Sequence, residues 1–145
     1  MKELTIPNNF DGNKYYEAQG DYPTSHKPGL LRVPDHLTQE IIDTYVTTLD
    51  DFKQLKIDLL WQSATSYEQK FISGSAPAKM LQLALQGNEK AAAIGVWLEQ
   101  LWGTYYTRRD LVVAAETQEA IDLVSEDFSS VGEIPFSVKE TIFGA

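Results

Sequence analysis

The sequence predicts a mainly α fold: a small helical bundle of two long antiparallel helices plus short helices, preceded by an extended, proline-rich N-terminal arm. Two patterns favour helices over residues 37–115: apolar residues recur every three or four positions, and capping residues and glycines flank the periodic runs. A chain of 145 residues with 43% hydrophobic residues has the size of one packed domain. We therefore expect an arm over residues 1–36, a helical core over 37–115 and an acidic tail over 116–145.

The arm is predicted from its prolines and its aromatic residues. Proline lacks a backbone N–H and restricts the residue before it, so a regular helix is not expected here, although one or two short strands are compatible. Three tyrosines in this stretch have rings large enough to favour burial, so we expect the arm to pack on the rest of the chain or on a partner. The prolines are Pro7, Pro23, Pro28 and Pro34, and the tyrosines are Tyr15, Tyr16 and Tyr22.

The first long helix is predicted to begin at Leu37 and to continue to Phe71, with a candidate break over residues 63–66. Asp35 or Thr38 is the expected N-cap, because a short polar side chain accepts a hydrogen bond from the first free amides of a helix. The expected apolar stripe is Leu37, Ile41, Tyr45, Leu49, Phe52, Leu55 (or Lys56) and Leu59.

A short helix and a second long helix follow. Ser75 is expected to cap the short helix, with Pro77 in its first turn and Gly87 in a left-handed conformation after its end. Asn88 is expected to cap the second long helix, which runs over residues 89–115.

This second long helix has a broad apolar face and two internal glycines. Gly95 and Gly103 are eight residues apart and share a face with Ala91. Because glycine costs a helix about 1 kcal/mol relative to alanine, the two glycines predict the close approach of another helix. The expected apolar face consists of Ile94, Trp97, Leu98, Leu101, Trp102, Tyr105 and Val112.

The tail carries seven acidic residues and one basic residue, so it holds most of the chain's net charge of −9. Thr117 is expected to cap a short turn, and Ser137 with Glu140 matches a capping box that begins a terminal helix ending at Gly144.

Composition excludes several classes of function. The absence of cysteine excludes disulfides, thiolate zinc sites, iron–sulfur clusters and a cysteine nucleophile. An acidic chain lacks the lysines and arginines that bind phosphate, so no nucleic-acid partner is expected. Residues 1–8 lack the apolar stretch of a signal peptide, and the most apolar run, 91–98, is far shorter than the roughly 20 residues of a membrane span. The sequence predicts no catalytic, cofactor-binding or metal site.

One cluster points to protein contacts. Six aromatic and arginine residues fall within thirteen positions on the second long helix: Trp97, Trp102, Tyr105, Tyr106, Arg108 and Arg109. They are expected to be core residues with arginines paired to the acidic tail, or a contact surface of the composition typical of interface hot spots. The candidate interaction residues are Tyr15, Tyr16, Tyr22, Trp102, Tyr106, Arg108 and Arg109.

From these observations we expect a non-catalytic structural, assembly or adaptor protein that binds a protein partner or itself as a homo-oligomer. Small phage virion and tail-assembly proteins often have this character, so the expected location is the cytoplasm, or the host cytoplasm or virion if the chain is phage-encoded. Two alternatives stay open at this point: an acidic regulatory or inhibitory protein that binds a basic partner surface, and an enzyme with a carboxylate and tyrosine site.

Overall fold

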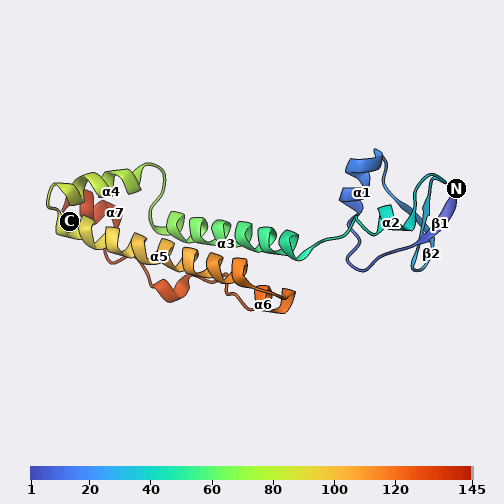
Figure 1. The fold of residues 1–145 in the computed structure, drawn as a ribbon. Helices are drawn as coiled ribbons and strands as arrows, with labels where there is room; N and C mark the ends of the chain where they lie inside the picture. The colour runs from blue at the N-terminus through green and yellow to red at the C-terminus, as the bar shows by residue number, and fades with distance from the viewer. Residues whose placement is uncertain (145) are drawn as a thin grey trace. The chain divides into compact units, whose positions relative to one another are not determined.

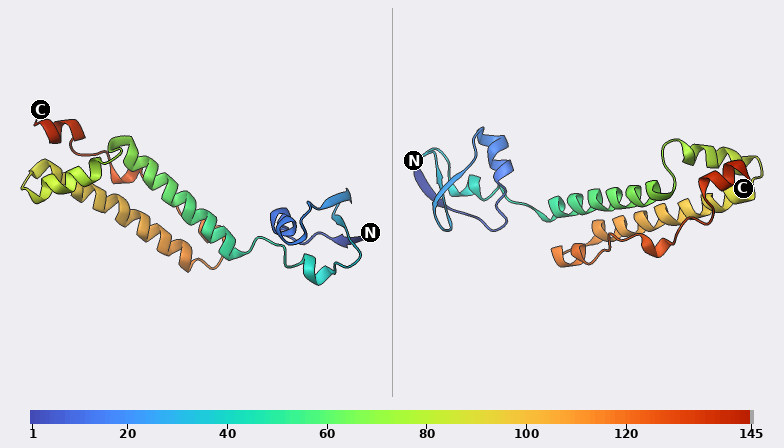
Figure 2. Two further views of the ribbon diagram at one scale, coloured as in Figure 1. Left: turned by 90° about the horizontal axis from the view of Figure 1, so that it is seen from above. Right: turned by 180° about the vertical axis from the view of Figure 1, so that it is seen from behind.

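A computed structural model describes residues 1–144 and confirms the mainly α, bundle-like fold with a small three-stranded sheet (Figures 1 and 2). The chain divides into two compact units, Met1–Asp51 and Phe52–Ala145. The boundary expected after residue 36 lies inside the first unit. Within residues 1–144, none of the helices is long and apolar enough to cross a membrane.

The first unit contains an antiparallel sheet with the strand order β1-β3-β2, formed by β1 (Lys2–Thr5), β2 (Thr24–Lys27) and β3 (Leu30–Val33). A tight turn at Pro28 and Gly29 joins β2 to β3. Proline sets the φ of the first turn position, and Gly29 adopts the positive φ of 76° that the second position requires. The prolines of the N-terminal region are therefore compatible with a compact sheet.

Helix α1 (Gly12–Gln19) was not expected in this region. Residues 12–19 contain no proline, so the prolines elsewhere in this region do not prevent a helix here. Asp11 caps its start, because a carboxylate oxygen accepts a hydrogen bond from the Asn13 amide at 2.9 Å. Gly20 ends the helix in the left-handed conformation, with φ of 81°.

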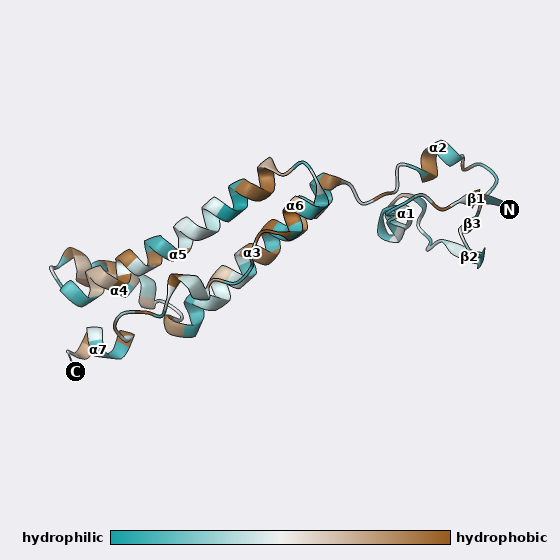
Figure 3. Ribbon diagram, turned by 90° about the horizontal axis from the view of Figure 1, so that it is seen from below, coloured by the Kyte–Doolittle hydropathy of each residue, from teal (hydrophilic) through white to brown (hydrophobic). Residues whose placement is uncertain are grey.

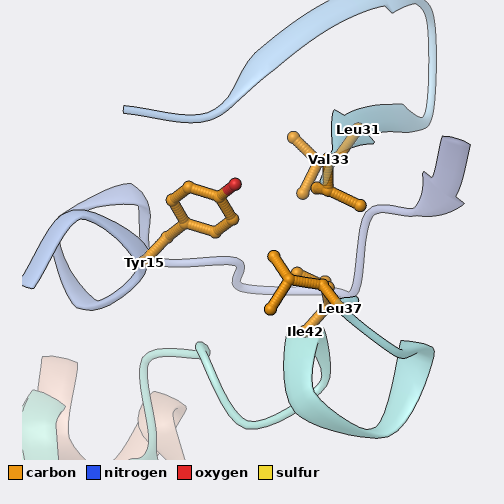
Figure 4. Close-up of a cluster of buried hydrophobic side chains, with 5 residues drawn as sticks. All are labelled: Tyr15, Leu31, Val33, Leu37 and Ile42. Carbon is orange, nitrogen blue, oxygen red and sulfur yellow. The ribbon is translucent and has the colours of Figure 1, made fainter. Parts of the chain in front are cut away.

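The core of the first unit lies between one face of the sheet and its two helices. Helix α2 (Gln39–Ile42) is capped by Thr38, as expected, and supplies one side of this core. Residues alternate along β3, so Leu31 and Val33 point to the same face and are buried. Five buried side chains form the core cluster in Figure 4: Tyr15, Leu31, Val33, Leu37 and Ile42.

The long helix expected from Leu37 is interrupted after Ile42, which corrects the sequence prediction. The Thr44 hydroxyl donates to the Ile41 carbonyl at 2.6 Å, a local bond that competes with helix continuation. Val46 then pairs with Phe10 in an isolated antiparallel bridge. The chain returns to helix only at α3 (Leu49–Phe71), which runs without a break over 63–66.

The interruption changes which side of α3 is buried. The expected stripe assumed one uninterrupted helical period, so a break shifts the phase of every later residue. Leu60 and Ala64 are buried, whereas Leu55 and Leu59 are exposed. The prediction that Leu55 and Leu59 belong to the core is therefore wrong, while the alternative Lys56 does lie on the buried side, with a side chain only 12% exposed.

The second unit is built on α3 and α5 (Glu89–Ala114), which pack antiparallel (Figure 2). Their contacts run in opposite directions along the two helices: the Trp61 ring lies 5.1 Å from Trp102, and the Phe71 ring lies 5.6 Å from Trp97. Helix α4 (Ala76–Leu85) packs against the first half of α5. Aromatic rings thus join α3 to α5 near both ends of the pair, around a core that also buries Leu60, Ile94 and Leu101.

The caps and the buried face of α5 agree with the sequence prediction. Gly87 has a φ of 88°, and the Asn88 side chain accepts from the Ala91 amide at 3.0 Å. At the other end, the Lys53 ammonium donates to the Val113 carbonyl at 2.7 Å and satisfies one of the free carbonyls of the last turn. The buried residues include Ile94, Trp97, Leu101, Tyr105 and Val112, with Leu98 and Trp102 half-buried.

The acidic segment after α5 contains α6 (Gln118–Asp122), a 3₁₀ turn (Ser129–Val131) and α7 (Val138–Phe143). Its middle is anchored at the Gly132 carbonyl. The Tyr67 hydroxyl and the Trp97 indole N–H both donate to this one oxygen, at 2.8 and 2.9 Å. Because Tyr67 lies on α3 and Trp97 on α5, the bond pair ties the segment to both long helices.

The capping box expected at α7 forms only in part. The Ser137 hydroxyl oxygen accepts from the Glu140 amide at 3.0 Å, as expected. The Glu140 carboxylate, however, pairs with Lys90 of α5 at 3.0 Å. The Glu140 side chain therefore forms a tertiary ion pair instead of the local hydrogen bond to the Ser137 amide that a capping box predicts. Thr117 caps α6 and Gly144 ends α7, both as expected.

Candidate protein interface

Two tryptophans meet at one edge of the α3–α5 pair. The Trp102 indole N–H donates to the Glu68 carboxylate at 3.1 Å, which holds its ring in place. The Trp61 ring packs 5.1 Å from Trp102 and 5.7 Å from Tyr105, yet half of its surface, 51%, stays exposed. We call Trp61, Trp102, Tyr105 and Tyr106 the aromatic edge.

The aromatic edge extends along α5 beyond the tryptophans. Trp102, Tyr106 and Arg109 are spaced four and three residues apart, so they follow one another along one face of the helix. The Tyr106 ring lies 5.2 Å from Tyr105 and is 52% exposed, and Arg109 is exposed. Two predicted interaction residues on α5, Tyr106 and Arg109, are therefore accessible next to an exposed tryptophan.

Arg108 has a different role from its neighbour. Its guanidinium donates to the Asp127 carbonyl at 2.7 Å and lies 4.6 Å from the centre of the buried Phe128 ring. Hydrogen bonds from the Ser129 amide and hydroxyl, together with the nearby Arg108 charge, lower the pKa of the Asp127 carboxyl. Arg108 therefore holds the acidic segment on α5, through a carbonyl and a ring.

The tyrosines predicted as interaction residues in the first unit separate into two kinds. Tyr15 is buried, and its ring lies 5.8 Å from Tyr45 within the core. Burial, followed by the charge of Asp21 and by Tyr45, raises the pKa of the Tyr15 hydroxyl. Tyr16 and Tyr22 are exposed and stack on each other at 4.4 Å. Only the stacked pair is placed where a partner can reach it.

A charged cluster stabilises the start of α3. The Lys14 ammonium donates to Asp51 at 2.6 Å and to the Val46 carbonyl at 2.7 Å. Thr48 and Asp51 form a reciprocal capping pair, with the Thr48 amide donating to the carboxylate at 2.8 Å. The Lys14 hydrogen bond, followed by that of the Thr48 amide, lowers the pKa of Asp51 to about 2. These bonds join α1, the segment before α3 and the first turn of α3, so the cluster has a structural role.

The outer side of α5 is hollowed along most of its length. A hollow of about 480 Å³ lies between α4 and α5, and three further hollows follow toward the end of α5. Adjacent hollows share residues: Val96 joins the first to the second, Gln100 the second to the third, and Leu111 the third to the fourth. We call these four neighbouring hollows together the outer groove.

Gly95 and Gly103 line the outer groove, which corrects the prediction made for them. A Cβ atom added at either position would meet no atom within 4 Å, so the glycines do not serve a close helix approach inside the chain. Helix α4 packs on α5 without contacting these positions closely. The two glycines instead leave the floor of the groove open.

Sequence reasoning missed Trp61 and most residues of the outer groove. Trp61 lies outside the stripe expected for α3, and a tryptophan on a face predicted to be polar was the available signal. Four apolar residues exposed in or beside the groove gave no such signal, because their helical spacing is equally compatible with burial in the core. They are Leu81, Val96, Leu111 and Leu123. Figure 3 shows hydrophobic residues recurring along α4 and α5.

In the part of the chain that the structure describes, no three His, Asp or Glu residues are grouped so that they could hold a metal ion. His26 lies on the exposed strand β2, and His36 is also exposed. No protein-family model matches this chain, and no curated protein or solved structure matches it. The interpretation therefore rests on the geometry of the aromatic edge and the outer groove.

Proposed function

We propose that this chain is a non-catalytic adaptor or assembly protein and that the aromatic edge is its principal contact surface. The observation that carries the proposal is the exposure of Trp61, whose ring packs on the anchored Trp102, and of Tyr106, one turn beyond Trp102 on α5. Tryptophan, tyrosine and arginine are the residues most enriched in interface hot spots. Arg109, one turn beyond Tyr106, adds the third type.

The rings are held before any partner arrives, which favours binding. Trp102 is fixed by its bond to Glu68, and Trp61 and Tyr106 each pack against a neighbouring ring. Ordering a free side chain on binding costs roughly 0.5–1.5 kcal/mol, and rings already packed avoid most of that cost. A partner gains the apolar area of two large rings at little entropic expense.

The experiment compares the proteins recovered with the full chain and with a Trp61→Ser/Tyr106→Ser variant from extracts of the cell that naturally expresses it. We expect at least one protein to be retained by the native chain and lost from the variant. Leu59→Ser is the matched control, because Leu59 is an exposed apolar residue on another face of α3. It should retain the same protein.

Two results would contradict the proposal. One is an identical set of recovered proteins for the native chain and the double variant, with both folded by circular dichroism. The other is equal loss in the Leu59→Ser control, which would mean that the interaction is nonspecific adhesion to apolar surface. Light scattering on the purified chain identifies the case in which the partner is a second copy, which the proposal includes.

A further inference from the structure

We propose that a hollow beside Lys56 binds a small zwitterionic ligand, an α-amino acid with an apolar side chain. The hollow has a volume of about 270 Å³ and is lined by residues of α3, of α6 and of the segment that follows α6. It shares no residue with the aromatic edge, so this site goes beyond the function proposed above. The inference rests on one lysine, two carboxylates and an apolar wall.

The Lys56 side chain is mostly buried, yet its ammonium is poorly paired. The side chain is 12% exposed, and its partner in the described part of the chain, the Glu126 carboxylate, lies 3.9 Å away, too far for a hydrogen bond. By contrast, the ammonium groups of Lys14, Lys53 and Lys90 each donate to an oxygen at 2.6 to 3.0 Å. An ammonium has three N–H donors, and leaving them unmade in a partly buried place is unfavourable. Lys56 is therefore placed to bind an acceptor oxygen of a ligand.

Two carboxylates determine the charge that the ligand must carry. Asp122 and Glu126 line the same hollow as Lys56, so the lining holds charges of both signs. An anion alone would be opposed by the two carboxylates, and a cation alone would leave the Lys56 donors without an acceptor. A zwitterion satisfies both, because its carboxylate accepts from Lys56 while its ammonium donates to Glu126. In an α-amino acid these two groups are attached to one carbon, so a single small molecule can bridge the 3.9 Å gap.

The rest of the lining is apolar and suits the side chain of the ligand. It consists of Phe52, Leu55 and Leu59 of α3 and Ile121 of α6. Ile121 is buried, whereas Leu55 and Leu59 are 58% and 47% exposed, so a ligand seated here would cover apolar area on both leucines. Pockets for drug-sized molecules have volumes of roughly 300–1,000 Å³, so a hollow of about 270 Å³ takes a smaller molecule, of the size of one amino acid.

The backbone beside Glu126 is held in place within the chain. The next residue, Asp127, accepts through its carbonyl from the Arg108 guanidinium at 2.7 Å, and through its carboxylate from the Ser129 amide at 2.9 Å. These bonds fix the segment that carries Glu126, while Lys56 is fixed by α3. The two charged groups are therefore positioned before a ligand arrives, which lowers the entropic cost of binding.

The test uses isothermal titration calorimetry of the full chain with L-leucine and with three analogues that each lack one feature. Isocaproate lacks the ammonium, isoamylamine lacks the carboxylate, and glycine lacks the apolar side chain. We expect L-leucine to bind with a Kd below about 1 mM and each analogue to bind at least about tenfold more weakly. Amide NMR shifts caused by L-leucine should be largest around Lys56, Ile121 and Glu126.

Two variants locate the site, and each has a matched control. Lys56→Met removes the ammonium but keeps an unbranched side chain, and Glu126→Gln removes one carboxylate charge. Each should weaken L-leucine by about tenfold or more, since a hydrogen bond to a charged group is lost. Lys70→Met and Glu119→Gln remove the same charges at exposed positions of α3 and α6 outside the hollow and should leave binding unchanged. Circular dichroism verifies folding, and the Glu126 side chain is 40% exposed, so Glu126→Gln carries the test if Lys56→Met does not fold.

Three results would overturn the inference. No binding of L-leucine up to about 10 mM, by calorimetry and by NMR, would mean that Lys56 and Glu126 form only a structural ion pair. An analogue that binds as tightly as L-leucine would show that the group it lacks is not recognised. Unchanged L-leucine binding in folded Lys56→Met or Glu126→Gln would place the ligand elsewhere. None of these results bears on protein capture by Trp61 and Tyr106, so the two proposals fail separately.

Discussion

The two units of this chain use their apolar residues differently. In the first unit, two short helices and one face of the sheet enclose Tyr15, Val33 and Ile42, while Tyr16 and Tyr22 stay exposed. In the second unit, the two longest helices bury one face each and leave large apolar residues exposed on the others, among them Trp61, Val96 and Leu111. Both units expose large apolar residues, and more of them lie on the helical unit, where we propose the principal contact surface.

The largest expected effect comes from truncating a core residue of the helical unit. Leu101→Ala removes a fully buried side chain of α5 and should lower the free energy of unfolding by about 2–5 kcal/mol. All three tryptophans lie in this unit, so their fluorescence in a denaturant titration reports its unfolding. Ile42→Ala, in the core of the first unit, should leave the denaturant midpoint of the tryptophan fluorescence change unaltered. A shared shift would mean that the two units unfold as one.

A smaller effect tests how the acidic segment is held. Arg108→Lys keeps the charge but loses the planar group that packs on Phe128 and donates to Asp127. We expect a loss of about 1–2 kcal/mol in local stability, seen as faster hydrogen exchange over residues 123–131. Arg109→Lys is the control and should leave exchange unchanged. Equal exchange in both variants would show that Arg108 does not anchor the segment.

The glycines of α5 distinguish an open groove from a packed one. Because Gly103 has a helical conformation and open space around it, Gly103→Ala should raise the stability of the second unit by up to about 1 kcal/mol. Gly87→Ala should lower it, since Gly87 has a φ of 88°. Thermal unfolding by circular dichroism measures both. Destabilisation by Gly103→Ala would mean that α5 is closely packed at that position.

The charged cluster of Lys14, Thr48 and Asp51 gives a pH dependence at the start of α3. Asp51 has a pKa of about 2, below its ordinary value of 3.8, so its carboxylate stabilises the folded form above pH 4. That contribution should be lost as the pH falls from about 4 toward 2, and Asp51→Asn should remove this part of the acid sensitivity. Carboxyl-carbon NMR should show the pKa of Asp51 rising in Lys14→Met. An unchanged pKa would show that Lys14 does not stabilise the Asp51 carboxylate.

Much of the fold followed from local patterns. The sequence predicts the caps at Asn88, Thr117 and Ser137 and the left-handed Gly87, because each depends only on residues within one helical turn. The sequence also predicts the buried face of α5, because no break interrupts the helical spacing of its apolar residues. The interaction roles of all seven candidate residues stay predictions: Tyr15, Tyr16, Tyr22, Trp102, Tyr106, Arg108 and Arg109. Among them, Tyr15 is buried in the core and Arg108 binds the Asp127 carbonyl within the chain.

The errors arose where a non-local contact decided the outcome. The first helix ends after Ile42, and Val46 then pairs with Phe10 before α3 begins at Leu49. This break shifts the phase of α3, so Leu55 and Leu59 are exposed instead of buried. The prediction of close helix packing at the glycines of α5 is wrong within the described residues, because a Cβ atom added at Gly95 or Gly103 meets no atom within 4 Å. A helical period shows that a residue prefers burial and does not show which molecule buries it.

The measurement that tests the contact role of the helical unit most directly is photo-cross-linking in the native cell. A benzophenone amino acid is placed at Tyr106 on the aromatic edge and, in a second protein, at Leu59 on another exposed face. The account predicts a discrete cross-linked protein from Tyr106 and none from Leu59. No product from Tyr106, or the same products from both positions, would contradict it.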